Sequence, residues 1–479
     1  MLTPWLTRRA AAAAALVVVI GGAAPTVAST PASPSGAVAG ATGIGDPYFP
    51  LDGNGGIDVL SYDVHDGYRF SDQRIRGWTT VTLRTTARLR SFDLDFLLPV
   101  SSVRLSTGRS TKRAAFDQPD GHELVISPGR PVAAGATVRV RIAYSGHPDR
   151  FGYAGERNWV ADDAEVVAVN EPHMAPWWFP SNDHPLDKAR MDLHLTVPRA
   201  DRVIANGHLA GVRRHGDHTT YHWSGGGQMA TYLAFFAAGR FVVRHGVHHG
   251  LPWYVAVSRQ LPRAHRRAAL QGLLRTPEIV GWLSRQLGPY PFARTGGVIT
   301  ELNPGFSLET QTRPTYPIEA SNTLMVHELA HQWFGDSVSV SHWRDIWLNE
   351  GFATFMQALW NEDHGGPTTR RWLHETYAAN GPGSALWALR ISDPGANHLF
   401  DFPVYQRGAM TLAALRERMG HHDFAHLLRI WVARHRHGHG TTAAFEALAT
   451  RIDGPGLQPL FAAWLEQSVR PAETSANGL

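Results

Sequence analysis

The stretch from 326 to 333 constrains the fold more than any other part of this 479-residue chain. It reads Val-His-Glu-Leu-Ala-His-Gln-Trp, with histidines at 327 and 331. On a helix, side chains four positions apart lie on one face, so His327 and His331 can present imidazole nitrogens to one metal ion. Glu328 follows the first histidine, where its carboxylate can reach a water molecule beside the metal without binding the metal. The stretch therefore predicts a helix that carries a metal site.

A third ligand is predicted at Glu350, which stands beyond residues 332–349 in the sequence Trp-Leu-Asn-Glu-Gly-Phe. The chain has no cysteine, which excludes disulfides and thiolate ligands, so a metal must be held by histidine and carboxylate groups. Two imidazoles and one carboxylate leave zinc an open position for water, which is typical of a catalytic site. Although the chain has 26 histidines, chance supplies only about 0.06 matches to His-Glu-x-x-His. We predict one Zn²⁺ per chain.

Charge and composition indicate a folded protein without a nucleic-acid partner. The chain has 45 basic and 41 acidic residues and a net charge of +4, with no concentrated basic segment of the kind that nucleic acids require. Its length and its hydrophobic fraction of 43% exclude a disordered polyelectrolyte and predict more than one domain.

The N-terminus has the pattern of an export signal. Arg8 and Arg9 precede an apolar stretch over 10–20 that is too short to span a bilayer, and small residues before Ser29 offer a cleavage site. We expect a signal peptide over 1–28, a flexible Ala/Ser/Pro/Gly-rich linker over 29–45, and a secreted protein. An uncleaved anchor is the alternative, and the choice between general and twin-arginine export stays open. Because no later apolar run reaches spanning length, we expect no stable membrane insertion after cleavage.

Residues 46–245 show the two-residue period of half-buried antiparallel strands. Apolar residues alternate with polar ones from Phe92 to Phe96, from Val138 to Tyr144 and from Met191 to Val197. Glycine and proline interrupt these runs throughout. We predict an N-terminal antiparallel β-sandwich-like domain that ends near the His-Gly stretch at 245–250.

Residues 246–470 change to helical patterns, so the whole chain is predicted to be a multidomain α+β protein. Pro277 and Glu278 favour a helix start, and Gly288 ends that helix; Ser321 is predicted to cap a second helix that runs to Phe334. Further helices are predicted over 345–360, 412–419 and 424–433. The small polar residues of 471–479 predict a loose tail.

The metal motif and three other segments resemble the gluzincin zinc aminopeptidases, the aminopeptidase N family that includes leukotriene hydrolase. Val404 to Ala409 is similar to that family's Tyr-x-Lys-Gly-Ala segment, and Gly305 to Glu309 stands in the place of its Gly-x-Met-Glu-Asn motif. Glu171, with the Trp-Phe-Pro-Ser-Asn-Asp-His-Pro run that follows it, is similar to the segment that borders the family's cleft. The order of all the segments agrees over about residues 50–467.

The resemblance implies a thermolysin-like, mainly helical catalytic domain over 246–470 and a role for each matching residue. It implies that Glu328 is the general base and that Tyr405 stabilises the tetrahedral intermediate. It implies that Glu309, together with Glu171, binds the free amine of a peptide substrate, and that Gly305 is a further substrate-binding residue.

The sequence departs from the family pattern at several of these places. Leu308 and Thr310 replace Met and Asn, and His173 stands where a second acid is frequent. Arg407 replaces Lys and keeps its charge. The sequence continues only briefly past Leu465, without the long helical C-terminal domain of larger members, which favours a more open cleft.

We therefore expect a secreted zinc aminopeptidase that removes N-terminal residues from peptides with a free N-terminus. A zinc endopeptidase or dipeptide-releasing enzyme is the alternative that the altered amine site allows. A non-catalytic scaffold protein is disfavoured, because such a protein is expected to lose Glu328 or a ligand, and all of them are present. The preferred N-terminal residue, the natural substrate and the oligomeric state stay open.

Overall fold

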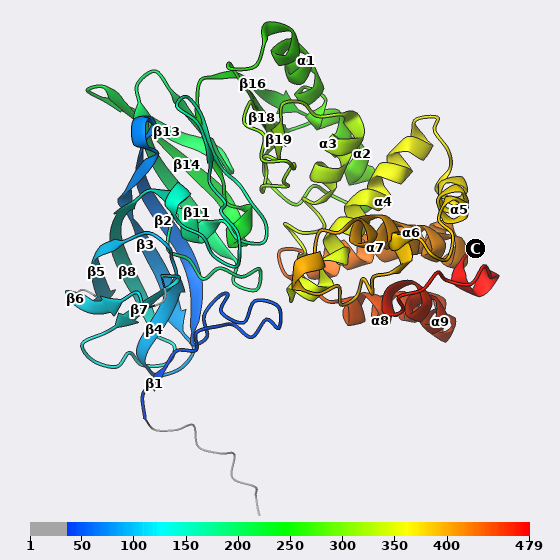
Figure 1. The fold of residues 1–479 in the computed structure, drawn as a ribbon, viewed down its shortest axis with the longest axis horizontal. Helices are drawn as coiled ribbons and strands as arrows, with labels where there is room; N and C mark the ends of the chain where they lie inside the picture. Colours follow the sequence, from blue (N-terminus) through cyan, green and yellow to red (C-terminus); the bar gives the residue numbers. More distant parts are fainter. Residues whose placement is uncertain (1–35, 109, 120) are drawn as a thin grey trace, which may run out of the picture. The chain divides into compact units, whose positions relative to one another are not determined.

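The computed structural model describes residues 36–108, 110–119 and 121–479 (Figure 1). Residues 37–479 form one compact unit. The predicted signal peptide and the first part of the predicted linker lie outside the described residues. None of the helices in the part that is described is long and apolar enough to cross a membrane.

Within the described residues, eleven strands form one large sheet in the order β1-β4-β7-β6-β5-β8-β3-β2-β11-β14-β13 (Figure 1). A smaller sheet has the order β12-β15-β10-β9. Phe236 in the small sheet lies 6.4 Å from Tyr68 in the large one, measured between ring centroids, so the two sheets share a core. The strands are β1 (Val38–Ala39), β2 (Ile57–Arg69), β3 (Arg74–Thr85), β4 (Leu89–Asp95), β5 (Val100–Thr107), β6 (Ser110–Asp117), β7 (Glu123–Ser127), β8 (Thr137–Gly146), β9 (Val160–Ala161), β10 (Val166–Ala168), β11 (Ala189–Pro198), β12 (Arg202–Ala205), β13 (His208–His215), β14 (His218–Met229) and β15 (Phe236–Gly239).

The predicted β-sandwich-like domain is confirmed, with two corrections in its detail. Strands β8 and β11 bury alternate side chains, as the two-residue period predicts. In β4, however, the polar partners Asp93 and Asp95 are buried as well. The sheet is also not wholly antiparallel, because β2 pairs with β11 in parallel and β1 pairs with β4 in parallel.

The second half begins with a mixed sheet, in the order β16-β17-β18-β19, and continues as helices (Figure 1). The predicted domain boundary at 245/246 falls inside β16, because the His-Gly stretch forms the end of β16 and the turn to β17. The strands are β16 (Phe241–His248), β17 (Leu251–Ser258), β18 (Thr295–Thr300), β19 (Thr315–Pro317), β20 (Ser339–Val340) and β21 (His439–Gly440). The helices are α1 (Arg263–Leu273), α2 (Thr276–Leu287), α3 (Asn322–Ala330), α4 (Trp347–Asp363), α5 (Thr369–Ala379), α6 (Phe402–Met419), α7 (His421–His435), α8 (Thr442–Asp453) and α9 (Gln458–Phe461).

The predicted start of the metal-site helix is confirmed, whereas its predicted end is wrong. The Ser321 hydroxyl accepts a hydrogen bond from the main-chain N–H of Leu324, which satisfies a donor at the start of α3. The helix ends at Ala330 rather than Phe334, and turns follow. His331 is the C-cap residue but keeps helical dihedral angles, so the spacing of its side chain from His327 is preserved.

Two segments that were predicted to be flexible are held by hydrogen bonds. In the predicted linker, β1 forms the edge of the large sheet by pairing with β4, and the main-chain N–H of Gly40 donates to the carbonyl of Ser91. In the predicted loose tail, the carbonyl of Asn477 accepts a hydrogen bond from the Trp464 indole. Gly478 fits against the main chain of Ala414 with a φ of +71°, where a Cβ atom would clash. Small residues serve close packing at both places, which composition alone does not reveal.

Lys188 connects the β domain to the turn that follows the metal-site helix. This residue precedes β11 and is buried, and its ammonium group donates to the carbonyls of Asp336, Ser337 and Gly438 at 2.9–3.0 Å. Burial lowers the pKa of Lys188 to about 7. The three carbonyls satisfy the ammonium donors where water has no access.

Candidate active site

The three predicted metal ligands lie together on two neighbouring helices. His327 and His331 come from α3 and its C-cap, and Glu350 lies in the first turn of α4. Glu350 Oε2 is 3.2 Å from His327 Nε2 and 3.4 Å from His331 Nε2. Donors about 3.3 Å apart are the edges of a tetrahedron around zinc with bonds of about 2.0–2.1 Å. We call these three residues the zinc-ligand set.

The second nitrogen of each imidazole is fixed by a partner that leaves Nε2 free. His331 Nδ1 is 3.0 Å from the carbonyl of Phe334, which can only accept, so Nδ1 carries the hydrogen. His327 Nδ1 is 3.3 Å from Oε1 of Gln357, whose amide nitrogen donates to the carbonyl of Thr323. Both imidazoles are thereby held in the tautomer that offers Nε2 to a metal. The donor set and its outer partners fit a zinc ion.

A close approach of two helices sets the position of Tyr405. Gly351 in α4 and Gly408 in α6 touch along their main chains, and a Cβ atom on either would lie within 3.0 Å of the other helix. This contact lies one residue after Glu350 and one turn after Tyr405 in their helices. It therefore places Tyr405 beside the zinc-ligand set, with its ring 6.0 Å from the ring of His327.

The zinc-ligand set opens into a cavity of about 550 Å³. Glu328, Tyr405, Glu309 and Glu171 also line this cavity, so the structure brings together every predicted site residue except one. The exception is Gly305, which is exposed, has a φ of +93° and precedes the lining residue Phe306. Its role in substrate binding stays a prediction.

The non-ligating carboxylates of the cavity differ in how they are held. Glu309 Oε1 accepts a hydrogen bond from the Tyr232 hydroxyl at 3.3 Å, and the main-chain carbonyl of Glu309 accepts one from the Gln332 amide at 2.9 Å. Glu309 and Glu328 each have a carboxylate oxygen within 4.8 Å of a nitrogen of His331. Glu171 Oε1 is buried and has no hydrogen-bond partner among the described residues.

Burial and mutual repulsion shift the pKa values of these acids. Burial raises the pKa of Glu171, Glu309 and Glu328, and other carboxylates of the cavity act in the same direction. Burial also acts to raise the pKa of Glu350, but the two imidazoles outweigh it and hold that pKa at about 2. Burial raises the pKa of Tyr405, so its hydroxyl stays protonated and can donate. The raised pKa values favour the neutral form of these three acids, and a metal dication or a substrate ammonium group in the cavity would favour their ionised form.

His173 does not belong to this cavity, although it follows Glu171 closely. It is buried, and its two ring nitrogens contact Asp52 at 2.6 Å and Glu156 at 3.3 Å. Burial acts to lower the pKa of His173, but these two acids outweigh it and raise that pKa to about 10. His173 is therefore a charged residue of the β-domain core rather than part of an amine site.

Arg407 lies on the opposite side of α6 from the cavity. Its buried guanidinium donates to main-chain carbonyls of residues 387, 389, 463, 467 and 469. Burial lowers the pKa of Arg407 to about 10. The Arg407 guanidinium therefore links α6 to the C-terminal segment by hydrogen bonds and does not line the substrate cavity.

Sequence reasoning missed the residues that hold the active groups in place. Gln357 orients His327, Tyr232 contacts Glu309, and the Gln332 side chain bridges the zinc helix and the Glu309 segment. The sequence gives a weak indication of Gln357, since this residue lies two turns after Glu350 in the same helix. It gives no indication of Tyr232, because that residue comes from the β domain.

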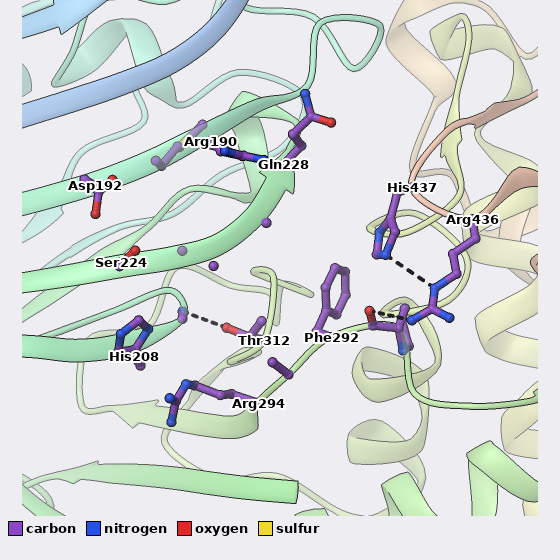
Figure 2. A pocket seen from close by; sticks show the side chains of 17 residues that line it. Arg190, Asp192, His208, Ser224, Gln228, Phe292, Arg294, Thr312, Arg436 and His437 are labelled. Atoms are coloured by element: carbon purple, nitrogen blue, oxygen red, sulfur yellow. Dashed lines mark hydrogen bonds between the residues drawn. The ribbon is translucent and has the colours of Figure 1, made fainter.

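A larger cavity of about 900 Å³ lies between β11, β14 and the segment 291–294 (Figure 2). Its described lining includes Arg190, Arg294 and Arg436 but no member of the zinc-ligand set. Figure 2 shows His437 and Arg436 at one side and His208 at the other. The volume of a cavity therefore does not identify the active site of this protein. The metal-binding donors of the zinc-ligand set identify it.

Comparisons with known proteins agree with this site. The Peptidase family M1 domain matches residues 297–464, and the Peptidase M1 N-terminal domain matches residues 60–233. The "Probable aminopeptidase 2" of Sulfurisphaera tokodaii is 24% identical over 88% of this chain and 55% of its own length. The aminopeptidase N of Lactococcus lactis is 26% identical over 69% of this chain and 41% of its own length. The chain thus spans about half the length of the curated relatives it matches.

The solved structures show the same relationship over a longer share. An M1 zinc metallopeptidase from Deinococcus radiodurans, solved as a mutant bound to a Tyr-Ser-Ala substrate, has a TM-score of 0.81 and 27% identity. The match covers 90% of this chain and 100% of that one. Two family models that match in order, and an active-site cavity that holds the zinc-ligand set, lead to one conclusion: the chain belongs to the M1 family of zinc peptidases.

Proposed function

We propose that this protein is a zinc aminopeptidase that cleaves the first residue from short peptides. One observation carries the proposal: two carboxylates that are not metal ligands, Glu309 and Glu171, line the same cavity as the zinc-ligand set. A peptide with a free N-terminus carries its positive charge one residue away from the bond to be cut. Two further carboxylates in the cavity of the zinc-ligand set can bind that charge, which favours an exopeptidase.

The residues of the chain divide the reaction between them. Zinc supplies Lewis acidity when bound: it polarises the scissile carbonyl and makes water a stronger acid. Glu328 takes the proton of the attacking water and passes it to the leaving amine, a general acid–base role. Its burial supports this, because a raised pKa lets the carboxyl group hold the proton between the two steps.

Tyr405 donates its hydroxyl hydrogen to the oxygen that becomes negative when water attacks. Such a donor typically contributes about 3–4 kcal/mol to the stability of the transition state. The contact between Gly351 and Gly408 supports this role, since it fixes the tyrosine relative to Glu350 before substrate binds.

Glu309 and Glu171 bind the substrate ammonium group. An ammonium group in a partly desolvated cavity needs negative partners, because an unpaired charge there is costly. Glu171 Oε1 is buried without a partner in the described structure, so a substrate N–H would satisfy it. Three exposed aromatic rings, Phe306, Phe400 and Phe402, also line the cavity and favour apolar substrate side chains nearby. That a related metallopeptidase was solved with Tyr-Ser-Ala supports short peptides as substrates.

Free and N-acetylated versions of one peptide test the proposal. Acetylation should lower kcat/KM, because the carboxylates lose their counter-charge. The corresponding rise in activation free energy should be about 2–5 kcal/mol. Glu309→Ala should weaken cleavage of the free peptide far more than cleavage of the blocked one. Glu301→Ala is the matched control, since Glu301 is an exposed acid of the same segment. If blocked peptides are cut at internal bonds as fast as free peptides are trimmed, the protein is instead a zinc endopeptidase.

We also propose that the protein is secreted, on the pattern of residues 8–28. Mass spectrometry of the N-terminus of protein recovered from the culture medium tests this. A new terminus near Ser29 supports secretion, and full-length protein that stays in the cell fraction contradicts it.

A further inference from the structure

A row of stacked side chains crosses five neighbouring strands of the large sheet. His65 on β2 pairs with His194 on β11, which pairs with His222 on β14. The rings of His65 and His194 are 4.1 Å apart with 2° between their planes, and those of His194 and His222 are 4.0 Å apart with 13°. On the other side, Trp78 of β3 stacks on His65, and Arg141 of β8 lies over Trp78. Strand pairing therefore brings the histidines together although they are far apart in sequence.

The row lies on the side of the sheet that faces away from the core. Side chains alternate between the two faces of a strand, and the neighbours of His65 and His194 at 64, 193 and 195 are buried in the core. The side chains of His65 and His194 are 27% and 25% exposed. Neither residue lines the active-site cavity or takes part in the proposed reaction.

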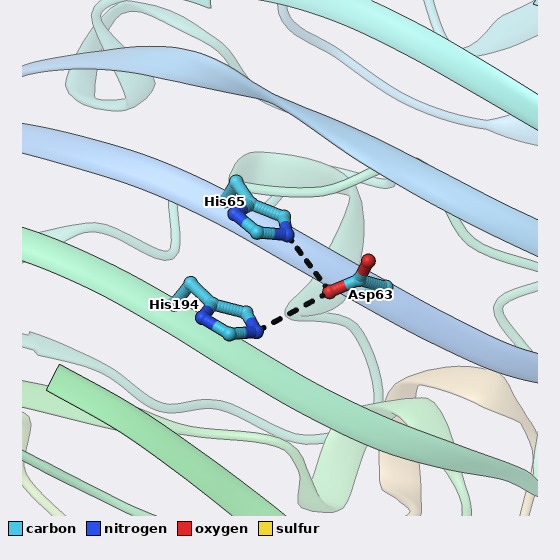
Figure 3. A group of neighbouring side chains, drawn as sticks. All are labelled: Asp63, His65 and His194. Carbon is cyan, nitrogen blue, oxygen red and sulfur yellow. Dashed lines mark ion pairs between the residues drawn. The ribbon is translucent and has the colours of Figure 1, made fainter. Parts of the chain in front are cut away.

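A single carboxylate oxygen lies between the two histidines (Figure 3). Asp63 Oδ1 is 2.9 Å from His65 Nε2 and 3.5 Å from His194 Nε2. Figure 3 shows both rings pointing the same nitrogen at this one oxygen. We call Asp63, His65 and His194 the sheet cluster.

The sheet cluster repeats the donors and the spacing of the zinc-ligand set. Each consists of two imidazole Nε2 atoms and one carboxylate oxygen, and the nitrogen–oxygen distances in the zinc-ligand set are 3.2 and 3.4 Å. The mean spacing of each is close to the edge of about 3.3 Å expected for a tetrahedral zinc site. In both groups, one ligand atom of each residue lies within 4.8 Å of the others.

The two groups differ in the orientation of their rings. The planes of His327 and His331 are 77° apart, whereas those of His65 and His194 are 2° apart. Because an imidazole binds a metal ion in the plane of its ring, one ring of the sheet cluster has to turn about its Cβ–Cγ bond before both Nε2 atoms can bind the same ion.

We propose that the sheet cluster binds a divalent transition-metal ion of the Zn²⁺, Cu²⁺ or Ni²⁺ class. Imidazole together with carboxylate is a donor set for these metals, whereas Ca²⁺ and Mg²⁺ prefer oxygen ligands. Water completes the coordination, since the cluster is open to solvent. The bound ion connects β2 to β11, which pair in parallel, and so stabilises the β domain.

Metal counting on the full chain tests this second site. After chelation, protein is dialysed against low-micromolar Zn²⁺, and the metal per chain is measured by elemental mass spectrometry. Wild type should bind two ions, the double variant His65→Gln/His194→Gln one, and His327→Ala/His331→Ala one. The variant with all four changes should bind none. His426→Gln, which alters an exposed histidine of α7, should bind two.

Cu²⁺ electron paramagnetic resonance identifies the ligands in the His327→Ala/His331→Ala background. The spectrum should show coupling to two nitrogens, and this coupling should disappear when His65 and His194 are also replaced. In the same background, Zn²⁺ should raise Tm, because a ligand that binds only the folded state stabilises it. If the sheet double variant fails to fold, Asp63→Asn provides the milder test and should weaken Zn²⁺ binding by at least tenfold. Binding of a single ion by wild type, or equal binding with and without the sheet cluster, overturns the proposal.

Discussion

The zinc-ligand set and the sheet cluster use the same donors in different surroundings. Side chains of the zinc-ligand set are 1–10% exposed, whereas those of the sheet cluster are 25–44% exposed. Two helices supply the first, and the register of two parallel strands supplies the second. Because the nitrogen–oxygen distances are so similar, donor spacing alone does not distinguish an active site from a simple binding site.

The neighbours of the donors make the difference. In the zinc-ligand set, Gln357 and the carbonyl of Phe334 fix the two imidazoles. Glu328 and Tyr405 stand beside the metal position in the same cavity without belonging to the ligand set. The sheet cluster instead has stacked rings on both sides and an open face. Removing each kind of neighbour in turn should show what it contributes.

Loss of the zinc-ligand set itself should have the largest effect. His327→Ala/His331→Ala leaves Glu350 as the only donor, so peptidase activity should be abolished. Tightly bound zinc should be missing after gel filtration in metal-free buffer, as elemental analysis will show. His65→Gln/His194→Gln is the matched variant and should keep both the tight zinc and the activity. Full zinc content in the first variant would contradict the assignment.

Glu328→Gln should leave the metal in place and remove the general base. We expect turnover to fall by at least about 10²-fold, because a neutral amide cannot accept the proton of water. Elemental analysis should still find zinc bound. Glu375→Gln, an exposed acid of α5, should behave as wild type. Near-normal turnover in Glu328→Gln would exclude Glu328 as the base.

Tyr405→Phe should reduce kcat by about 10²–10³-fold, the usual cost of losing a transition-state donor. KM should change little, since the hydrogen bond forms mainly in the transition state. Tyr377→Phe removes another hydroxyl that donates a hydrogen bond, the one to the carbonyl of Pro471, and should affect stability alone. An effect confined to KM would mean that Tyr405 only lines the cavity.

Gln357→Leu should give the smallest effect of the four. It removes the acceptor that orients His327, and such outer partners usually contribute about 10–100-fold in metal affinity. Competition with a zinc chelator measures the change. Gln286→Leu, on α2 and away from the cavity, is the control. Unchanged affinity would show that the helix alone orients the imidazole.

Much of the fold was predictable because the local pattern and the tertiary structure agree. The two-residue period predicted β8 and β11, and the Ser321 cap gave the start of α3. The predicted boundary at 245/246 falls within the β16–β17 hairpin, because a glycine-rich turn is equally typical of a linker and of a hairpin. The packing of Gly478 against α6 could not be predicted from composition, because it is a contact between residues distant in sequence.

The sequence by itself predicted the members of the zinc-ligand set, and the structure brings these three residues together. The helical repeat aligns His327 with His331, and the demanding combination with Glu350 identifies the third ligand. Tertiary structure decided which other residues complete the site. Only the crossing of Gly351 and Gly408 brings Tyr405 to the metal position, and only the fold of the β domain turns His173 away from it.

The sheet cluster lies at the other extreme. Nothing local connects Asp63 and His65 with His194, and the chance content of 26 histidines hides them. They meet because β2 and β11 pair in parallel in one register, and a shift of one residue would turn each side chain to the other face. Local periodicity determines which side chains share one face of a helix. The register of distant strands instead depends on the packing of the whole core, so no single segment of the sequence predicts it.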